Sequence, residues 1–171
     1  TLVMGVLNIT EDSFSDGGLW LDPANAKAHG EAMMKDGADI IDIGAESTRP
    51  GAKRVSEEDE QNRVLGAVDA LIPEGAVLSI DTTRASVARM ALEHGAQIIN
   101  DVSGGQLDRE VPHVVAEHAE SLYIVQHWRG WLAGSAGDVP DANTSVYANG
   151  VVNDVYDELM KQVDDVLQAG V

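Results

Sequence analysis

Five short apolar runs alternate with longer amphipathic segments, and this alternation restricts the fold more than any other feature of the chain. The runs are Leu2–Leu7, Ile40–Ile43 (interrupted by Asp42), Val77–Ile80, Gln97–Val102 and Leu122–Val125. Each is nearly continuous in Val, Ile and Leu, which is the pattern of a strand buried on both faces. Strands that alternate with helices predict a parallel sheet with right-handed crossovers.

The segments between the runs carry signals for the beginning and the end of helices. Asp22 before Pro23 is a typical N-cap, and Gly37 stands where a glycine commonly ends a helix. Ser56 and the acid three residues later resemble a capping box. The last segment has the most regular apolar stripe and ends at Gly170. Its members are Val152, Val155, Leu159, Val163, Val166 and Leu167.

Two α/β architectures fit this order, an open doubly wound sheet and a (β/α)₈ TIM barrel. The glycine-rich G-x-G-x-x-G motif of a dinucleotide-binding sheet does not follow the first run. Polar residues stand at or near the ends of the runs, namely Asn8, Asp42, Asp81, Asn100 and His127. In a barrel these positions converge on the mouth where catalysis occurs. We therefore expect residues 1–171 to form one partial barrel domain of about five β/α units, lacking strands six to eight.

Composition excludes several functional classes. The chain has 11 Lys and Arg against 29 Asp and Glu, a net charge of −18, which disfavours binding to nucleic acid or an anionic membrane. It contains no cysteine, which excludes disulfides, a cysteine nucleophile and cysteine-ligated metals. No apolar run reaches the ~18–20 residues that span a bilayer, and no signal peptide opens the chain, so we expect a cytoplasmic protein.

Two polar loops follow the first two runs. The first, Asn8–Gly18, surrounds Phe14, the only phenylalanine of the chain, with acids and hydroxyls; the second, Asp42–Gly51, ends in Arg49-Pro50-Gly51. The residues alone fit a binding loop as well as a polar surface loop with a turn or a salt bridge. Likewise, buried acids at the strand ends either hold neighbouring loops or bind the N–H edge of a heterocycle. For His127 we expect a structural, loop-anchoring role.

These segments together resemble the dihydropteroate synthase family of pterin-binding barrel enzymes. The resemblance rests on Leu2–Gly18, Ala38–Gly51, Ser79–Thr82, Ile99–Gly105 and, for actinobacterial members, Gln126–Arg129. It implies a (β/α)₈ barrel that condenses dihydropterin pyrophosphate with p-aminobenzoate and releases pyrophosphate. It also implies Mg²⁺ as cofactor, a homodimer and inhibition by sulfonamides.

The resemblance also implies roles for individual residues. Those of the pterin pocket and the metal are Asp81 and Asn100 on the pterin edge, Val102 on its face, Asp42 beneath it and Asn8 as ligand of Mg²⁺. Those of the two loops are Thr48 on the diphosphate, Phe14, Arg49 and Pro50 around p-aminobenzoate, and Asp16 beside the pterin cation. We expect Asp16 and Arg49 to act in catalysis.

The chain departs from the family pattern in places. Gln126 replaces a methionine and Ala45 replaces a glycine, changes that we expect to adjust pterin affinity. The family's later motifs are absent, so we expect the 171 residues alone to be inactive or nearly so. Two alternatives remain: a methyltetrahydrofolate-type methyltransferase, which the Phe14 loop and the Arg49 loop disfavour, and a non-catalytic half-barrel that binds pterin weakly or self-associates.

Overall fold

The computed structural model describes residues 1–10, 22–46, 54–129 and 146–171. Strands and helices alternate through these ranges as predicted. The strands are β1 (Met4–Asn8), β2 (Ile40–Gly44), β3 (Leu78–Asp81), β4 (Ile98–Asp101) and β5 (Leu122–Val125). The helices are α1 (Pro23–Lys35), α2 (Glu57–Leu71), α3 (Ala85–Glu93), α4 (Glu110–Ala116) and α5 (Val151–Gln168), with a 3₁₀ turn η1 (Ile72–Glu74) after α2.

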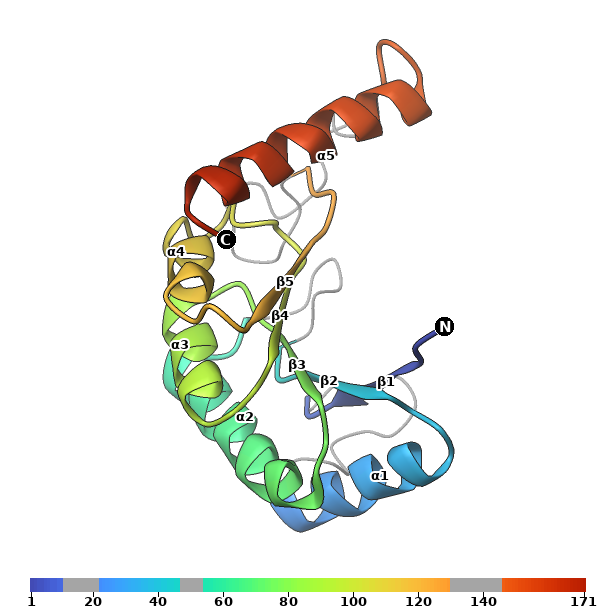
Figure 1. Cartoon of the computed structure of the whole chain (residues 1–171), viewed down its shortest axis with the longest axis vertical. Helices are drawn as coiled ribbons and strands as arrows, with labels where there is room; N and C mark the ends of the chain where they lie inside the picture. The colour runs from blue at the N-terminus through green and yellow to red at the C-terminus, as the bar shows by residue number, and fades with distance from the viewer. Residues whose placement is uncertain (11–21, 47–53, 130–145) are drawn as a thin grey trace.

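The strands form one parallel sheet in the order β1-β2-β3-β4-β5, so each strand pairs with the next in the chain. The sheet curves, and α1 to α4 follow its outer side (Figure 1). Right-handed crossovers that always step in one direction place every helix on the same face, whereas a doubly wound sheet reverses direction and covers both faces. The arrangement is that of consecutive barrel units, as the polar strand ends predicted.

Local sequence signals begin and end the helices where they were expected. The side chain of Asp22 accepts a hydrogen bond from the amide of Ala24 at 3.0 Å, and Ser56 accepts one from Asp59 at 3.1 Å. Beyond α1, Gly37 has a φ of +106°, a conformation that favours glycine. These caps fix the helices against the outer face of the sheet.

The hydrophobic core lies between the sheet and the helices. Alternate residues of the strands point outward and are fully buried there, while valines and leucines of the helices meet them. The core includes Leu7, Ile41, Ile43, Leu78, Ile80 and Ile99 from the strands and Val64, Val68, Leu71, Val87 and Val111 from the helices. Packing against the helices therefore fixes the outward-pointing residues of the strands. The residues between them point to the inner face of the sheet.

The prediction that every strand is buried on both faces is wrong for the two edge strands. Val6 of β1 is 55% exposed and Leu122 of β5 is 63% exposed. Both belong to the inner set of their strands, where no second layer from the described residues covers them. The apolar runs predicted strands correctly, but helices bury only their outer side here.

Helix α5 has the predicted end and most of the predicted face. Val155, Leu159 and Val163 of the apolar stripe are half-buried and Val166 is buried, whereas Val152 and Leu167 are 82% and 59% exposed. Two polar residues on the same side, Asp154 and Gln162, are buried as well. Specific polar contacts direct the helix, because Asp154 bonds Asn149 and Gln162 bonds backbone carbonyls beside the sheet. None of the helices in the described ranges is long and apolar enough to cross a membrane.

Candidate active site

Strand register brings three predicted polar residues into one row. Asn8 pairs with Gly44, Gly44 with Asp81, and Asp81 with Asn100. Residues paired across parallel strands point to the same face, and Leu7, Ile43, Ile80 and Ile99 already occupy the outer core. The row therefore faces the inner side at the carboxyl ends of the strands. Asp42 lies on the same face, two residues earlier on β2.

Gly44 provides space between two side chains of this row. A β-carbon at this position would lie 3.4 Å from Oδ1 of Asn8 and 3.7 Å from Oδ2 of Asp81. The amide of Asn8 and the carboxylate of Asp81 thus approach the same point above β2 from opposite sides. Glycine permits this close approach because it has no side chain.

Asp42, Asn100 and Gln126 form a short hydrogen-bonded chain across the row. Nδ2 of Asn100 donates to Oδ2 of Asp42 at 3.2 Å, and Nε2 of Gln126 donates to Oδ1 of Asn100 at 2.7 Å. Asp42 is only 5% exposed, and its Oδ1 has no hydrogen-bond partner among the described residues. A buried carboxylate oxygen without a donor is costly, so this atom is suited to accept an N–H from a bound molecule.

Asp81 changes its protonation near neutral pH. Burial is the main cause that raises its pKa, and the nearby carboxylates of Asp42, Asp101 and Glu46 raise it further, to about 7. Such a carboxyl group accepts hydrogen bonds when it is ionised and donates one when it is protonated. A shifted carboxyl group at the strand ends of a barrel is a typical feature of a functional site.

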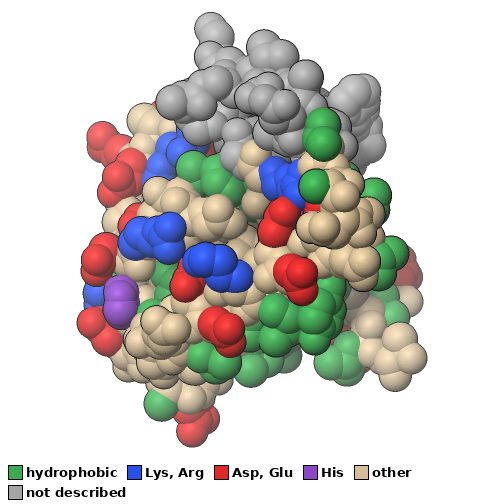
Figure 2. All heavy atoms as spheres, turned by 90° about the horizontal axis from the view of Figure 1, so that it is seen from above, with side chains coloured by type: hydrophobic (Ala, Val, Ile, Leu, Met, Phe, Trp, Pro, Cys, Tyr) green, Lys and Arg blue, Asp and Glu red, His purple; other side chains and the backbone are tan. Residues whose placement is uncertain are grey.

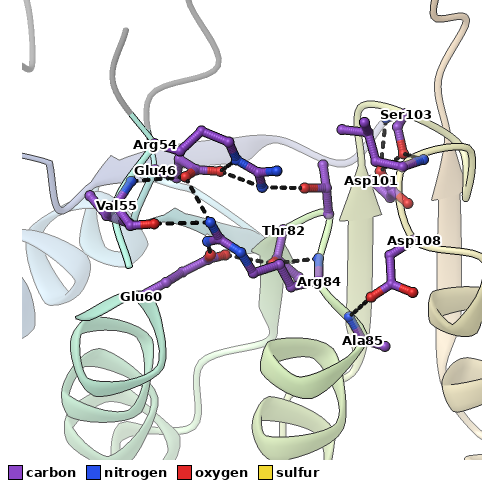
Figure 3. A network of polar contacts seen from close by, with 12 residues as sticks. Glu46, Arg54, Val55, Glu60, Thr82, Arg84, Ala85, Asp101, Ser103 and Asp108 are labelled. Atoms are coloured by element: carbon purple, nitrogen blue, oxygen red, sulfur yellow. Dashed lines mark hydrogen bonds and ion pairs between the residues drawn. The ribbon is translucent and has the colours of Figure 1, made fainter. Parts of the chain in front are cut away.

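A network of charged residues borders the row where β2 and β3 end (Figure 3). Glu46 accepts hydrogen bonds from Nε of Arg54 at 2.9 Å and from the amide of Val55 at 3.0 Å. Arg84 contacts Glu46 at 3.3 Å and forms an ion pair with Glu60 of α2. The network fixes the two chain segments immediately before and after residues 47–53.

Asp101 holds the loop that follows β4. It accepts bonds from the amide and hydroxyl of Ser103, both at 2.8 Å, from the amide of Gly105 at 2.9 Å and from the hydroxyl of Tyr123 at 2.7 Å. Asp101 is fully buried and follows Asn100, so alternation turns it away from the row. Burial and the charge of Asp101 raise the pKa of Tyr123, which keeps its hydroxyl protonated.

His127 and Arg129 tie the end of β5 to α5. Nε2 of His127 lies 2.8 Å from Glu158, and Arg129 donates to the same carboxylate through Nε at 2.8 Å. These bonds, that of Arg129 first, lower the pKa of Glu158 to about 2. The loop-anchoring role expected for His127 is confirmed.

A cavity of about 580 Å³ lies beside α5 and contains none of the row residues. Its lining includes Arg109, Arg129 and Lys161 together with Glu158 and Asp165. On the face of the molecule seen from above, basic and acidic side chains are mixed, and neither sign forms a patch of its own (Figure 2). The row, with its unpartnered carboxylate oxygen and shifted pKa, is the better candidate for chemistry.

Comparison with known proteins decides the family. The model of the family described as pterin binding enzyme matches residues 4–171. This chain belongs to the pterin binding enzyme family. A similar curated relative is the dihydropteroate synthase of Mycobacterium leprae, 46% identical over 169 residues, which cover 99% of this chain and 57% of the relative. The chain thus spans little more than half the length of such relatives.

Solved pterin binding enzymes have the same fold. A dihydropteroate synthase from Clostridium difficile, crystallised with pteroic acid, is 33% identical with a TM-score of 0.82 and covers 100% of this chain and 60% of its own. One from Xanthomonas albilineans, with 4-aminobenzoic acid, is 35% identical with a TM-score of 0.81, covering 99% and 57%. The predicted α/β architecture, five consecutive units of a TIM barrel, is confirmed.

The structure places only some of the predicted site residues of this pterin binding enzyme. Asn8, Asp81 and Asn100 share the row, and Asp42 is bonded to Asn100. Val102 is half-buried directly after β4. The five loop residues lie outside the described residues, namely Phe14, Asp16, Thr48, Arg49 and Pro50.

Sequence reasoning missed the charged residues that support the site. Among the described residues, the ion pairs that border residues 47–53 join Glu46 to Arg54 and to Arg84. Glu60 is 1% exposed although it belongs to an acid-rich first turn that suits a helix N-terminus equally well. Its partners lie more than 20 residues away, and no local pattern signals such a pairing.

The row can hold a magnesium ion only at a site with few protein ligands. In the described part of the chain, no group of three or more histidine or acidic side chains could hold a metal. Asn8, however, presents a hard amide oxygen beside Gly44, 3.4 Å from where a β-carbon would stand. Mg²⁺ commonly takes one or two protein ligands and completes its shell with phosphate oxygens and water. The donor set is compatible with that kind of site.

Proposed function

We propose that the protein to which this chain belongs is a dihydropteroate synthase. It would condense 6-hydroxymethyl-7,8-dihydropterin pyrophosphate with p-aminobenzoate to give 7,8-dihydropteroate and pyrophosphate. The observation that carries the proposal is the row at the strand ends, where the half-buried acid Asp81 and the amide of Asn100 lie on the same face as the buried acid Asp42. The full-chain similarity to enzymes of that name supports it.

Recognition of the pterin follows from the hydrogen-bonding groups of the row. A pterin ring presents an amino group and a ring N–H side by side, which are donors. Asp81 and the unpartnered Oδ1 of Asp42 are acceptors, while the amide of Asn100 offers both kinds of group. Matching donors to buried acceptors gives specificity, because an analogue without them leaves the acceptors unsatisfied. Val102 lines the face of the ring in this proposal.

In the proposed reaction, the nitrogen of p-aminobenzoate attacks the methylene carbon of the pterin. The C–O bond breaks first, and pyrophosphate leaves with its electron pair, so that a cation remains at the methylene carbon. The lone pair of the nitrogen then forms the C–N bond, and the nitrogen releases a proton to the departing pyrophosphate. The roles proposed for the loops are diphosphate contact by Thr48, an aminobenzoate pocket from Phe14, Arg49 and Pro50, and stabilisation of the pterin cation by Asp16. Closure of such loops would exclude water from the cation.

We also propose that Asn8 holds Mg²⁺ through its side-chain oxygen. Mg²⁺ supplies charge neutralisation for the pyrophosphate leaving group. Asn8 would orient the pyrophosphate at the end of β2, where its side-chain oxygen lies beside Gly44. This placement answers the problem that a strongly acidic protein has in binding a polyanion.

Replacing Asn8 with alanine should separate pyrophosphate binding from pterin binding. In the full-length protein we expect the Mg²⁺-dependent gain in affinity for the pterin pyrophosphate to fall about tenfold or more, since one ligand bond is lost. Affinity for 6-hydroxymethylpterin, which has no phosphate, should change less than about twofold. Calorimetry with and without Mg²⁺ measures both. An unchanged Mg²⁺ dependence would remove Asn8 from the metal site.

The experiment that tests the function is a condensation assay with the full-length protein. We expect labelled dihydropteroate when both substrates and Mg²⁺ are present, and inhibition by sulfonamides that p-aminobenzoate relieves. The 171 residues produced alone should give no more product than a control without enzyme. Absence of product from the full-length protein, with binding of methyltetrahydrofolate, would favour the methyltransferase instead.

The oligomeric state and the location complete the proposal. We propose a cytoplasmic homodimer for the full-length protein and self-association for the 171 residues alone. The exposed inner side chains Val6 and Leu122 support self-association, because an open apolar face at a sheet edge favours pairing. Sedimentation at several concentrations measures it, and a monomer at all of them would contradict it.

A further inference from the structure

Gln126 follows β5 and, within the described residues, contacts the candidate site through the side chain of Asn100. Its Nε2 donates to Oδ1 of Asn100 at 2.7 Å, and Nδ2 of Asn100 donates to Asp42 at 3.2 Å. We propose that Gln126 is a positioning residue whose amide fixes the side chain of Asn100 and so sets the donors and acceptors that the site offers to a ligand. The identity of the ligand rests on the proposed pterin function. The positioning of Asn100 by Gln126 does not depend on it.

The chemistry of Asp42, Asn100 and Gln126 allows the hydrogen bonds between them to run in one direction. An ionised carboxylate only accepts hydrogen bonds, so Asp42 requires the nitrogen of the Asn100 amide. The oxygen of that amide then points to Gln126, which must present its own nitrogen. One N–H and one lone pair of Asn100 remain for a ligand. If residue 126 presented an acceptor instead of a donor, the Asn100 amide would have to rotate. Its oxygen would then face the carboxylate of Asp42.

Helix α5 fixes the position of Gln126. Nε2 of Gln162, a residue 6% exposed, donates to the carbonyl of Gln126 and to the carbonyl of Ser103, both at 3.2 Å. A β-carbon at Gly104, where φ is +58°, would lie 2.8 Å from the same nitrogen. This close packing leaves Gln162 little freedom, so the backbone that carries Gln126 is held where its side chain reaches Asn100.

Two substitutions of Gln126 by side chains of similar size test the role of its hydrogen-bond donor. Gln126→Met removes the donor, and Gln126→Glu replaces it with an acceptor. We expect Gln126→Met to weaken binding of 6-hydroxymethylpterin by about fivefold to tenfold, the loss of one well-formed hydrogen bond, and Gln126→Glu by more. Selectivity against the analogue with a carbonyl in place of the amino group should fall by a similar factor. The probe carries no phosphate, so added charge does not repel a pyrophosphate.

A double-mutant cycle with Asn100→Ala shows whether Gln126 acts through Asn100. If it does, the effect of each Gln126 substitution should fall below about twofold once Asn100 is absent. A direct ligand contact, or a purely electrostatic effect of Gln126→Glu, would persist in the Asn100→Ala background and would overturn the proposal. Gln168→Met, at an exposed position of α5, is the matched control and should leave binding unchanged.

A second measurement needs no ligand. In the unliganded full-length protein, the side-chain amide proton of Asn100 that bonds Asp42 should exchange with water at least about tenfold faster after Gln126→Met, and at the same rate after Gln168→Met. Unchanged exchange would overturn the positioning role. Faster exchange in a protein that binds no pterin would keep the role and refute the proposed function, so the two failures are distinguishable.

Discussion

Replacing Asp81 with asparagine is expected to weaken pterin binding by about 100-fold in the full-length protein. The asparagine has the same shape, but it replaces one acceptor oxygen with an N–H donor. That donor would face the donor edge of the pterin, and hydrogen bonds to charged groups are the strong ones. Calorimetry with 6-hydroxymethylpterin at about pH 8 measures the loss. The control is Asp69→Asn, whose side chain is 57% exposed on α2 and should have no effect.

The same carboxylate makes binding depend on pH. Burial first, and then Asp42, Asp101 and Glu46, raise the pKa of Asp81 to about 7. Below this pH the group is protonated in the free protein, and the donor edge of the pterin binds the ionised form. Affinity should therefore fall about tenfold per pH unit below pH 7 and stay constant above it. In the Asp81→Asn variant this dependence should disappear; if it persists, another group is titrating.

The raised pKa of Asp81 also lowers the stability of the folded protein. Stability therefore decreases as pH rises, whereas affinity for the pterin increases. Between pH 3.8 and about 7 the folded protein holds a proton on Asp81 that the unfolded chain has released. The free energy of unfolding therefore decreases as pH rises through this window, and the full cost is present above pH 7. Asp81→Asn should stabilise the unliganded protein at about pH 8 by up to about 4 kcal/mol. Urea unfolding that shows a marked loss instead would mean that Asp81 makes stabilising contacts.

The elements of the fold were predictable because their signals are local. Asp22 and Ser56 cap helices through bonds to residues two and three positions away, and Gly37 ends one by its backbone conformation. The convergence of Asp81 and Asn100 was also predictable, although they are far apart in sequence. It follows from the rule that parallel strands present their carboxyl ends at one edge.

What sequence reasoning did not find depends on long-range partners. Glu60 is buried because Thr82 and Arg84 approach it from the end of β3. The burial of Gln162 on the inward side of α5 was missed for a similar reason, since its contacts are with the distant backbone carbonyls of Ser103 and Gln126. Polar contacts of this kind have no periodicity, so a hydrophobic pattern cannot indicate them.

The ion pair of Glu60 and Arg84 is expected to have the largest effect on stability in the described residues. Glu60 is 1% exposed, and its other hydrogen-bond partner among the described residues is the hydroxyl of Thr82 at 2.5 Å. Arg84→Met keeps the apolar stem of the side chain and removes the charge. It leaves a buried carboxylate with a single neutral donor, which should cost about 3–5 kcal/mol at about pH 8. Urea unfolding of the full-length protein measures this loss.

One further variant determines whether charge is the cause. In the Arg84→Met background, Glu60→Gln removes the buried charge, and the glutamine oxygen can still accept the hydrogen bond from Thr82. This second substitution should therefore recover at least about half of the loss.

The surface of α5 supplies a matched control for this pair. Lys161 pairs with Asp165 at 2.8 Å, but its side chain is 75% exposed, and such pairs contribute about 0.5 kcal/mol or less. Lys161→Met should therefore change the free energy of unfolding very little. If Arg84→Met costs no more than Lys161→Met, the segments that border residues 47–53 are held by something other than this network. If it costs several times more, the buried pair is what holds the end of β3 against α2, and with it one border of the site.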